Sequence, residues 1–287
     1  MCSSDLYDAL GLALAHRDEL VAEVTGDRLV VEVEGEGAGG VPVDETHLVV
    51  RALHVALGAL LGPGARPPGL RLTCHNVVPH ARGLGSSSAA IVGGLALGRA
   101  LVPDGAERLD DQALLALAAD LEGHPDNVAP AVLGGFTIAG RTDDGPWWSV
   151  RLDVADGIGA VAMVPPDAVS TELARGLLPD RVPHADAADN AGAAALLVAA
   201  LTGHPEMLLP ATRDRLHQDQ REPAMPASLA LVRALRADGL AAVVSGAGPT
   251  VLVLTTSPEE SRVVAARTPA GWRGLVLDVD PRGVVIR

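Results

Sequence analysis

A predicted strand, a glycine-rich loop and a predicted helix follow one another between residues 70 and 101, and they constrain the fold more than any other stretch. This order of elements aims backbone N–H groups and a helix N-terminus at an anion. An ordinary capped helix after a turn is the alternative, but three consecutive serines at the helix start favour an anion site. We expect the ligand's phosphates to lie over Pro79, His80, Ala81, Arg82, Gly83, Leu84, Gly85, Ser86, Ser87, Ser88 and Ala89.

The chain contains no lysine, because all 22 of its basic residues are arginine. A Walker loop, G-x-x-x-x-G-K-[ST], is therefore excluded. The lysine chemistry of protein kinases and of Schiff-base enzymes is excluded for the same reason. A phosphate group bound at this loop must be held by backbone amides, hydroxyl groups, arginine and a metal ion.

The composition is that of an acidic globular protein. Hydrophobic residues make up 48% of the 287 residues and aromatic residues only 2%, so the core must consist of Leu, Val and Ala. A formal net charge of −14 argues against nucleic acid and anionic membranes as partners. The two cysteines form no disulfide framework, and no apolar run reaches the ~20 residues of a membrane span. We therefore expect a cytoplasmic protein.

Apolar patterns with strand and helix periods alternate along the chain. Residues 18–24 and 28–34 predict a β-hairpin, and residues 275–278 and 283–286 predict a second hairpin that closes the fold. Mixed helices and antiparallel hairpins favour an α+β fold over a doubly wound sheet. A change of pattern near residues 153–159 divides the chain into two domains, residues 1–154 and 155–287.

A second concentration of polar residues lies in residues 122–135, between an apolar helix and an apolar strand. Asp126 or Asn127 could simply cap a short helix that starts at Val128. A cap needs one such residue rather than the five polar residues present, so the segment favours a functional site.

The loop at residues 79–90 resembles the second motif of the GHMP kinases, P-x-x-x-G-L-G-S-S-A-A, with one additional serine. Residues 122–135 most closely resemble the E-G-H-P-D-N-V-A-P-A-x-x-G-G segment of the homoserine kinase branch of that family. Three further segments are similar to family motifs: residues 170–179 to S-T-x-x-A-R-x-x-L-P, residues 217–221 to H-Q-x-Y-R with Gln220 for tyrosine, and residues 245–250 to S-G-x-G-P-T.

The resemblance implies a two-domain GHMP kinase fold, with mixed and antiparallel sheets on which helices pack. It implies that ATP and Mg²⁺ are used to phosphorylate the hydroxyl of L-homoserine to O-phospho-L-homoserine, for threonine biosynthesis. Because an α-carboxylate is best bound by arginine forks, two motif arginines suit this substrate. The implied substrate-binding residues are Asp8, His124, Arg175, Arg221, Gly246 and Gly248, and the implied catalytic residues are Asp126 and Asn127.

The metal site is implied to combine Ser87 with an acidic residue near the end of the helix before residue 123. Asp120 and Glu122 are both candidates, and Asp120 is favoured because it lies within the helix that the family uses. Asp126 aligns with the catalytic aspartate of mevalonate kinases. Whether it removes the hydroxyl proton or orients the hydroxyl with Asn127 stays open.

The first GHMP motif, P-x-x-x-A-N-x-G-x-G-F-D, is reduced here to Tyr7-Asp8. Residues 1–6 show no pattern that replaces its strand, its asparagine or its glycines. A truncated reading frame and a divergent protein both explain this, and we expect truncation, because every later motif is intact. Another GHMP small-molecule kinase, and a binding protein without turnover, are the two rival functions. The resemblance also implies a homodimer.

Overall fold

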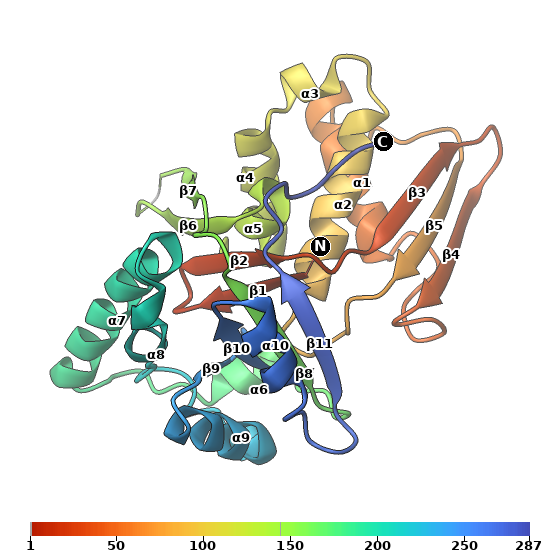
Figure 1. Cartoon of the computed structure of the whole chain (residues 1–287). Helices are drawn as coiled ribbons and strands as arrows, with labels where there is room; N and C mark the ends of the chain where they lie inside the picture. The colour runs from red at the N-terminus through yellow and green to blue at the C-terminus, as the bar shows by residue number, and fades with distance from the viewer. Residues whose placement is uncertain (1, 144) are drawn as a thin grey trace.

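The computed structural model describes residues 2–143 and 145–287, and these residues form three β-sheets with helices packed on them (Figure 1). The first sheet is antiparallel with the order β1-β2-β6-β7, from Cys2–Leu6, Leu10–Leu14, Phe136–Arg141 and Trp147–Leu152. The second is antiparallel with the order β11-β8-β10-β9, from Arg273–Asp278, Gly159–Val164, Val251–Thr255 and Ala241–Val244. The third is mixed with the order β3-β5-β4, from Glu19–Val24, Leu70–Asn76 and Leu29–Gly35. These sheets and helices confirm the α+β class.

The helices of the first half pack together beside the first and third sheets (Figure 1). They are α1 (Leu48–Leu61), α2 (Ser86–Ala100), α3 (Gly105–Arg108), α4 (Asp111–Glu122) and α5 (Val128–Leu133). A close approach of α1 and α2 depends on two glycines of α2. A Cβ at Gly94 would lie 2.4 Å from the carbonyl oxygen of Val49, and one at Gly98 would lie 2.6 Å from that of Leu53. These two glycines therefore allow α1 and α2 to pack closely. This packing holds α2, and with it the N-terminus of α2, in place.

The second half supplies α6 (Thr171–Gly176), α7 (His184–Thr202), α8 (Leu208–Ala211), α9 (Pro226–Ala237) and α10 (Pro258–Ala265). One apolar core joins the two antiparallel sheets to α7. It contains Leu12 and Phe136 from the first sheet, Ala160 and Leu254 from the second, and Leu197 from α7. Because burial of these side chains from water stabilises both halves at once, the loops at the junction of the sheets are held in fixed positions.

Both predicted hairpins are wrong. Strands β3 and β4 do not pair with each other, because β5 lies between them, antiparallel to β3 and parallel to β4. Strand β11 pairs with β8 instead of with residues 283–286, which form no strand. The strands at residues 18–24, 28–34 and 275–278 were predicted correctly and the one at residues 283–286 was not, and β11 has its partner in a distant part of the sequence.

Residues 2–6, which show no recognisable sequence pattern, form strand β1. This strand pairs with β2 through a tight turn in which Tyr7 and Asp8 have the left-handed φ values of 60° and 54°. The first sheet therefore has a strand ahead of Tyr7-Asp8, contrary to the expectation that this strand is missing. The glycine-rich loop of the first motif has no counterpart in the turn.

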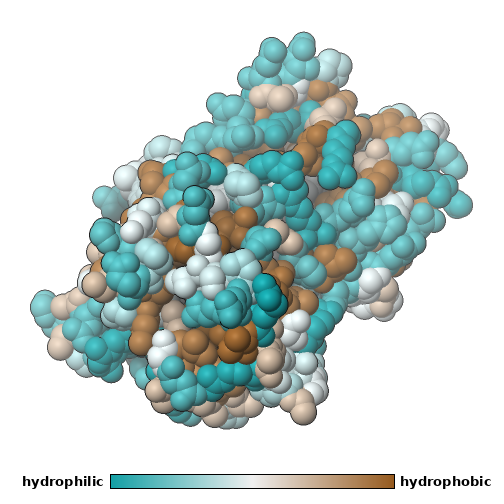
Figure 2. Space-filling view, in the orientation of Figure 1, coloured by the Kyte–Doolittle hydropathy of each residue, from teal (hydrophilic) through white to brown (hydrophobic). Residues whose placement is uncertain are grey.

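Hydrophilic residues cover most of the face seen in Figure 2, as the net charge of −14 leads one to expect. In the part of the chain that the structure describes, no helix is both long enough and apolar enough to span a bilayer.

Candidate active site

The N-terminus of α2 follows the loop of residues 79–85. Gly85 is the N-cap residue, with a left-handed φ of 70°, and no side chain caps the helix. Ser87 and Ser88 do not cap the helix but bind a carboxylate. Ser87 Oγ donates to Glu122 Oε2 at 2.8 Å, and Ser88 Oγ donates to Glu122 Oε1 at 3.0 Å. The first-turn amides of a 15-residue helix stay available to an anion.

A segment of the second half, residues 245–250, holds the loop in place. Ser245 Oγ donates to the carbonyl oxygen of Gly83 at 2.5 Å, and the Thr250 amide donates to that of Arg82 at 3.3 Å. Gly83 has a φ of 70°, and a Cβ there would lie 2.1 Å from the Ser245 carbonyl oxygen, so no other residue fits without rearrangement. Two motifs that are distant in the sequence therefore form one continuous structure.

Arg82 ties the loop to the end of β8. Its guanidinium group donates to the carbonyl oxygens of His80 at 2.7 Å, Pro165 at 3.1 Å and Pro166 at 2.5 Å. These bonds use three of its five N–H donors, so Arg82 both fixes the loop and keeps donors that an anion could accept from.

An open cleft lies beside the start of α2. Residues of the loop and α2 form one side of it, and the segment before α1 forms the other. Its lining includes Pro42, Thr46, His47, Asn76, His80, Ser86, Ser87 and Ala90. No sequence motif had pointed to residues 41–47 or to Asn76.

The two candidate metal ligands face different partners. Glu122 lies against Ser87 and Ser88, as described above, whereas Asp120 Oδ1 accepts a hydrogen bond from Trp147 Nε1 at 2.8 Å. Residues two apart on a helix point to different sides. The structure thus brings Glu122, and not the favoured Asp120, to the phosphate loop.

His124, Asp126 and Asn127 form one hydrogen-bonded group directly after α4. The Asp126 side chain is only 1% exposed, and its Oδ1 accepts from His124 Nδ1 at 2.5 Å and from the Asn127 amide at 2.7 Å. Burial disfavours a charged His124 ring, but the hydrogen bond and charge of Asp126 outweigh it and raise the pKa of His124. Asn127 is the N-cap residue of α5, yet no side chain caps that helix. Capping therefore does not explain these residues.

A second, small pocket lies between the β1–β2 turn and the segment that precedes α9. It is lined by Tyr7, Asp8, Asp214, His217, Gln218, Arg221, Val243, Val244 and Gly246. Arg221 is 5% exposed, and its Nη1 donates to the carbonyl oxygen of Gly246 at 2.8 Å. Its buried Nε has no hydrogen-bond partner among the residues that the structure describes. A buried guanidinium group with an unused donor suits an anionic ligand.

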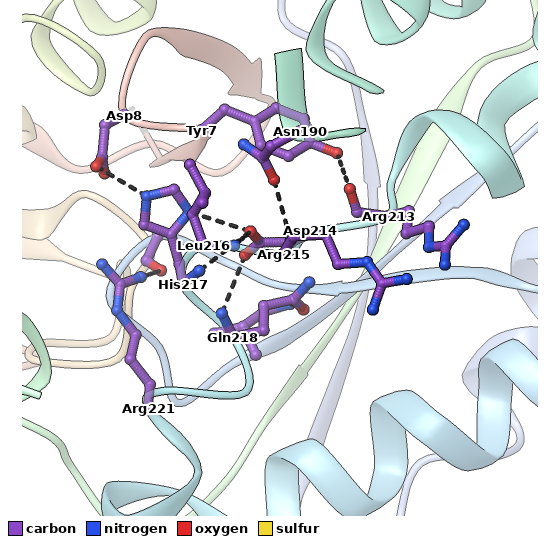
Figure 3. Close-up of polar contacts among 12 residues, drawn as sticks. Tyr7, Asp8, Asn190, Arg213, Asp214, Arg215, Leu216, His217, Gln218 and Arg221 are labelled. Atoms are coloured by element: carbon purple, nitrogen blue, oxygen red, sulfur yellow. Dashed lines mark hydrogen bonds and ion pairs between the residues drawn. The ribbon is translucent and has the colours of Figure 1, made fainter. Parts of the chain in front are cut away.

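Asp8 supplies a carboxylate to the same pocket (Figure 3). Its Oδ2 lies 3.0 Å from His217 Nε2. The hydrogen bond from His217 lowers the pKa of Asp8, and the charges of Arg221 and Arg175 act in the same direction. The charge of Arg175, an exposed residue on α6, also acts on His124. Arg175 therefore lies close enough to Asp8 and to His124 for its charge to act on both.

The two glycine candidates differ in position. Gly246 lines the pocket and binds Arg221 through its carbonyl group, whereas Gly248 packs against Met225 and Gly83. Sequence reasoning missed Asp214 and gave no role to His217, although His217 belongs to the H-Q-x-Y-R motif. The available signal was an acidic residue three positions before that histidine.

Comparisons with known proteins agree with the fold described above. Residues 47–135 match the GHMP kinases N terminal domain, and residues 194–273 match the GHMP kinases C terminal domain. A homoserine kinase from Streptomyces avermitilis is 52% identical over 280 residues, which cover 98% of this chain and 90% of that protein. One from Leifsonia xyli is 48% identical and covers 98% and 87%. The crystal structure of a homoserine kinase from Cytophaga hutchinsonii has a TM-score of 0.81 at 24% identity and covers 98% and 95% of the two chains.

The fold, the phosphate loop and both domain matches define a kinase of the GHMP class. Identity near 50% over almost the full length narrows this class further. The chain belongs to the homoserine kinase family, whose members are phosphotransferases.

Proposed function

We propose that this protein transfers the γ-phosphoryl group of ATP to the side-chain hydroxyl of L-homoserine and forms O-phospho-L-homoserine. The observation that carries this proposal is the pocket in which a buried arginine faces a carboxylate. A free amino acid is a zwitterion, and the pocket offers one charge of each sign for it. Mevalonate-type substrates have no ammonium group and would leave Asp8 unpaired.

The nucleotide is proposed to occupy the open cleft, with its phosphates over residues 79–89 and the N-terminus of α2. The donors suit Mg²⁺, because a hydroxyl and a carboxylate are hard oxygen ligands and lie 2.8 Å apart in Ser87 and Glu122. Among the described residues no group of three or more His, Cys, Asp or Glu could hold a metal ion alone. This fits Mg²⁺, which usually takes one or two protein ligands together with phosphates and water. When bound, the ion neutralises negative charge on the β- and γ-phosphates.

The substrate carboxylate is proposed to bind Arg221 and Arg175, and its ammonium group to bind Asp8. The hydroxyl then points toward His124, Asp126 and Asn127. Because Asp126 is buried and already accepts hydrogen bonds from both neighbours, its role is to hold them in place, and Asn127 orients the hydroxyl. Phosphoryl transfer needs little covalent help from the protein, so positioning and charge neutralisation supply most of the rate.

We also propose that the protein works in the cytoplasm as a homodimer, with domains at residues 1–154 and 155–287. The two family matches end and begin on opposite sides of this boundary, which supports the division. The acidic composition supports the proposal that neither nucleic acid nor an anionic membrane is a partner of this protein.

A coupled assay of ADP release tests the proposed function with L-homoserine, mevalonate and galactose as acceptors. We expect turnover with L-homoserine only. Turnover with one of the other acceptors instead would identify a different GHMP kinase. Nucleotide binding without ADP release on any acceptor would identify a binding protein.

The proposed metal site predicts different results for neighbouring substitutions. Ser87→Ala and Glu122→Gln should each raise the KM for Mg·ATP about tenfold, because the first removes an oxygen ligand and the second removes the negative charge of the other ligand. Asp120→Asn should change this KM less than about twofold, since Asp120 contacts Trp147 instead. Binding of ATP in the presence of EDTA should be unchanged in all three variants. A larger effect of Asp120→Asn than of Glu122→Gln would reverse the assignment.

A further inference from the structure

The β1–β2 turn itself does little to orient the carboxylate of Asp8. Asp8 lies in the left-handed β1–β2 turn, and its side chain is 56% exposed. Within the described residues, the one hydrogen bond recorded for its carboxylate comes from His217 Nε2, 209 positions later in the chain. The orientation of Asp8 therefore depends on His217.

His217 is in turn fixed by Asp214 (Figure 3). Asp214 Oδ1 lies 3.2 Å from His217 Nδ1 and accepts from the backbone amides of Leu216 at 2.8 Å and His217 at 3.1 Å. Asp214 Oδ2 accepts from the Gln218 amide at 3.0 Å. The side chain of Gln218 binds the Val244 amide of β9 at 2.7 Å, so the whole segment is attached to the second sheet.

We propose that His217 is a positioning residue for substrate recognition, which holds the Asp8 carboxylate in the orientation that pairs with the substrate ammonium group. This inference rests on the proposed function. The glycine-rich loop of the first motif is absent from the β1–β2 turn, and His217 orients Asp8 from the opposite side of the pocket.

The charges of the group support this role. Both ring nitrogens of His217 face carboxylates, so both carry protons in the folded protein. Its positive charge offsets the negative charge of Asp214, which leaves Asp8 and Arg221 as the charges offered to a zwitterion. Without the imidazolium group the charge of Asp214 would be uncompensated, and the substrate carboxylate would bind less tightly beside Arg221.

The titration of His217 lies above neutral pH. Burial would lower its pKa, but the hydrogen bonds and charges of Asp214 and Asp8 outweigh burial and raise the pKa to about 9. The charged groups around His217 keep their charge states between neutral pH and about pH 9. Arg175 and Arg221 are cations, the pKa values of Asp8 and Asp214 are below their usual range, and burial raises the pKa of the Tyr7 phenol.

Substitution of His217 should separate the two substrates kinetically. At pH 7, His217→Ala should raise the KM for L-homoserine about tenfold, while kcat and the KM for ATP change less than about twofold. His217→Gln, which keeps a donor but not the charge, should fall between the wild type and His217→Ala. The exposed His204, which pairs with Glu206 at 3.2 Å, provides the control, and His204→Ala should match the wild type.

A double-mutant cycle with Asp8→Asn tests whether His217 acts through Asp8. If it does, the double variant should have a homoserine KM no higher than about twice that of the weaker-binding single variant. Multiplied effects would show that His217 acts independently of Asp8 and would overturn the inference. So would an equal rise in the KM values for homoserine and ATP. If the wild type itself does not phosphorylate homoserine, the proposed function fails instead.

The pH dependence gives a second readout. The ratio of homoserine KM values for His217→Gln and the wild type, measured at the same pH, cancels the titration of the substrate amine. His217 is protonated below its pKa, so the ratio should be constant between pH 6.5 and 8 and should fall toward one as the pH rises past about 9. A ratio that does not change across pH 9 would contradict the role of the imidazolium charge.

Discussion

Arg221→Ala is expected to raise the KM for L-homoserine by about 30- to 150-fold and to leave the KM for ATP nearly unchanged. The physical reason is the loss of a charge-assisted guanidinium fork, worth on the order of 2–3 kcal/mol, at a buried position where water cannot replace it. Arg221 is 5% exposed and has an unpartnered Nε, so its binding capacity is not used up within the protein.

Two further variants make the Arg221 experiment specific. Arg221→Lys should recover only part of the affinity, because an ammonium group lacks the planar fork. Arg233 is an exposed arginine whose guanidinium group pairs with Asp219 and Glu222, and Arg233→Ala should behave as the wild type. An equal effect of Arg221→Ala on both substrates, with an unchanged melting temperature, would contradict a role in binding the homoserine carboxylate.

Asp126→Asn should lower kcat about a hundredfold, with a small change in either KM. The substitution keeps the size of the side chain and one acceptor oxygen but removes the negative charge, which weakens the hydrogen bonds from His124 and from the Asn127 amide. A displacement of ~1 Å in a group that orients the substrate can cost about a hundredfold in rate. Initial rates with both substrates saturating would measure the effect.

The pH profile of Asp126→Asn distinguishes an orienting role from proton removal. If Asp126 only orients its neighbours, the variant should keep the shape of the wild-type profile of kcat at a lower level. Loss of the acidic limb in the variant would instead identify Asp126 as a general base. Asp280 provides a matched control, because it is also buried and pairs with Arg17. Asp280→Asn should lower stability without a comparable loss of kcat.

The sequence predicted those parts of the fold and site that depend on local pattern. Strands β3, β4 and β5 and helix α2 were predicted from a few neighbouring residues each. Strand partners are not local, so the insertion of β5 between β3 and β4 could not be predicted from alternating residues at 18–34. The same limit explains the closing hairpin, which was wrong because β8 provides the partner of β11.

The choice between Asp120 and Glu122 shows the same limit at the scale of one helix. Both residues lie in the last turns of α4, and the sequence does not say which side of α4 faces α2. Only the packed structure shows that Glu122 meets Ser87 while Asp120 meets Trp147. His217 was missed for a related reason, because its partner Asp8 lies 209 positions away.

Residues 245–248 contact both the phosphate loop and the arginine of the amino-acid pocket, through Ser245 to Gly83 and through Gly246 to Arg221. One short segment of backbone thus sets the geometry of two sites that take chemically different molecules. A compound that wedges between Gly83 and this segment would disable both sites together without imitating either substrate. Because coupling between sites is reciprocal, ATP and the amino acid would each oppose the binding of such a compound although it occupies neither site.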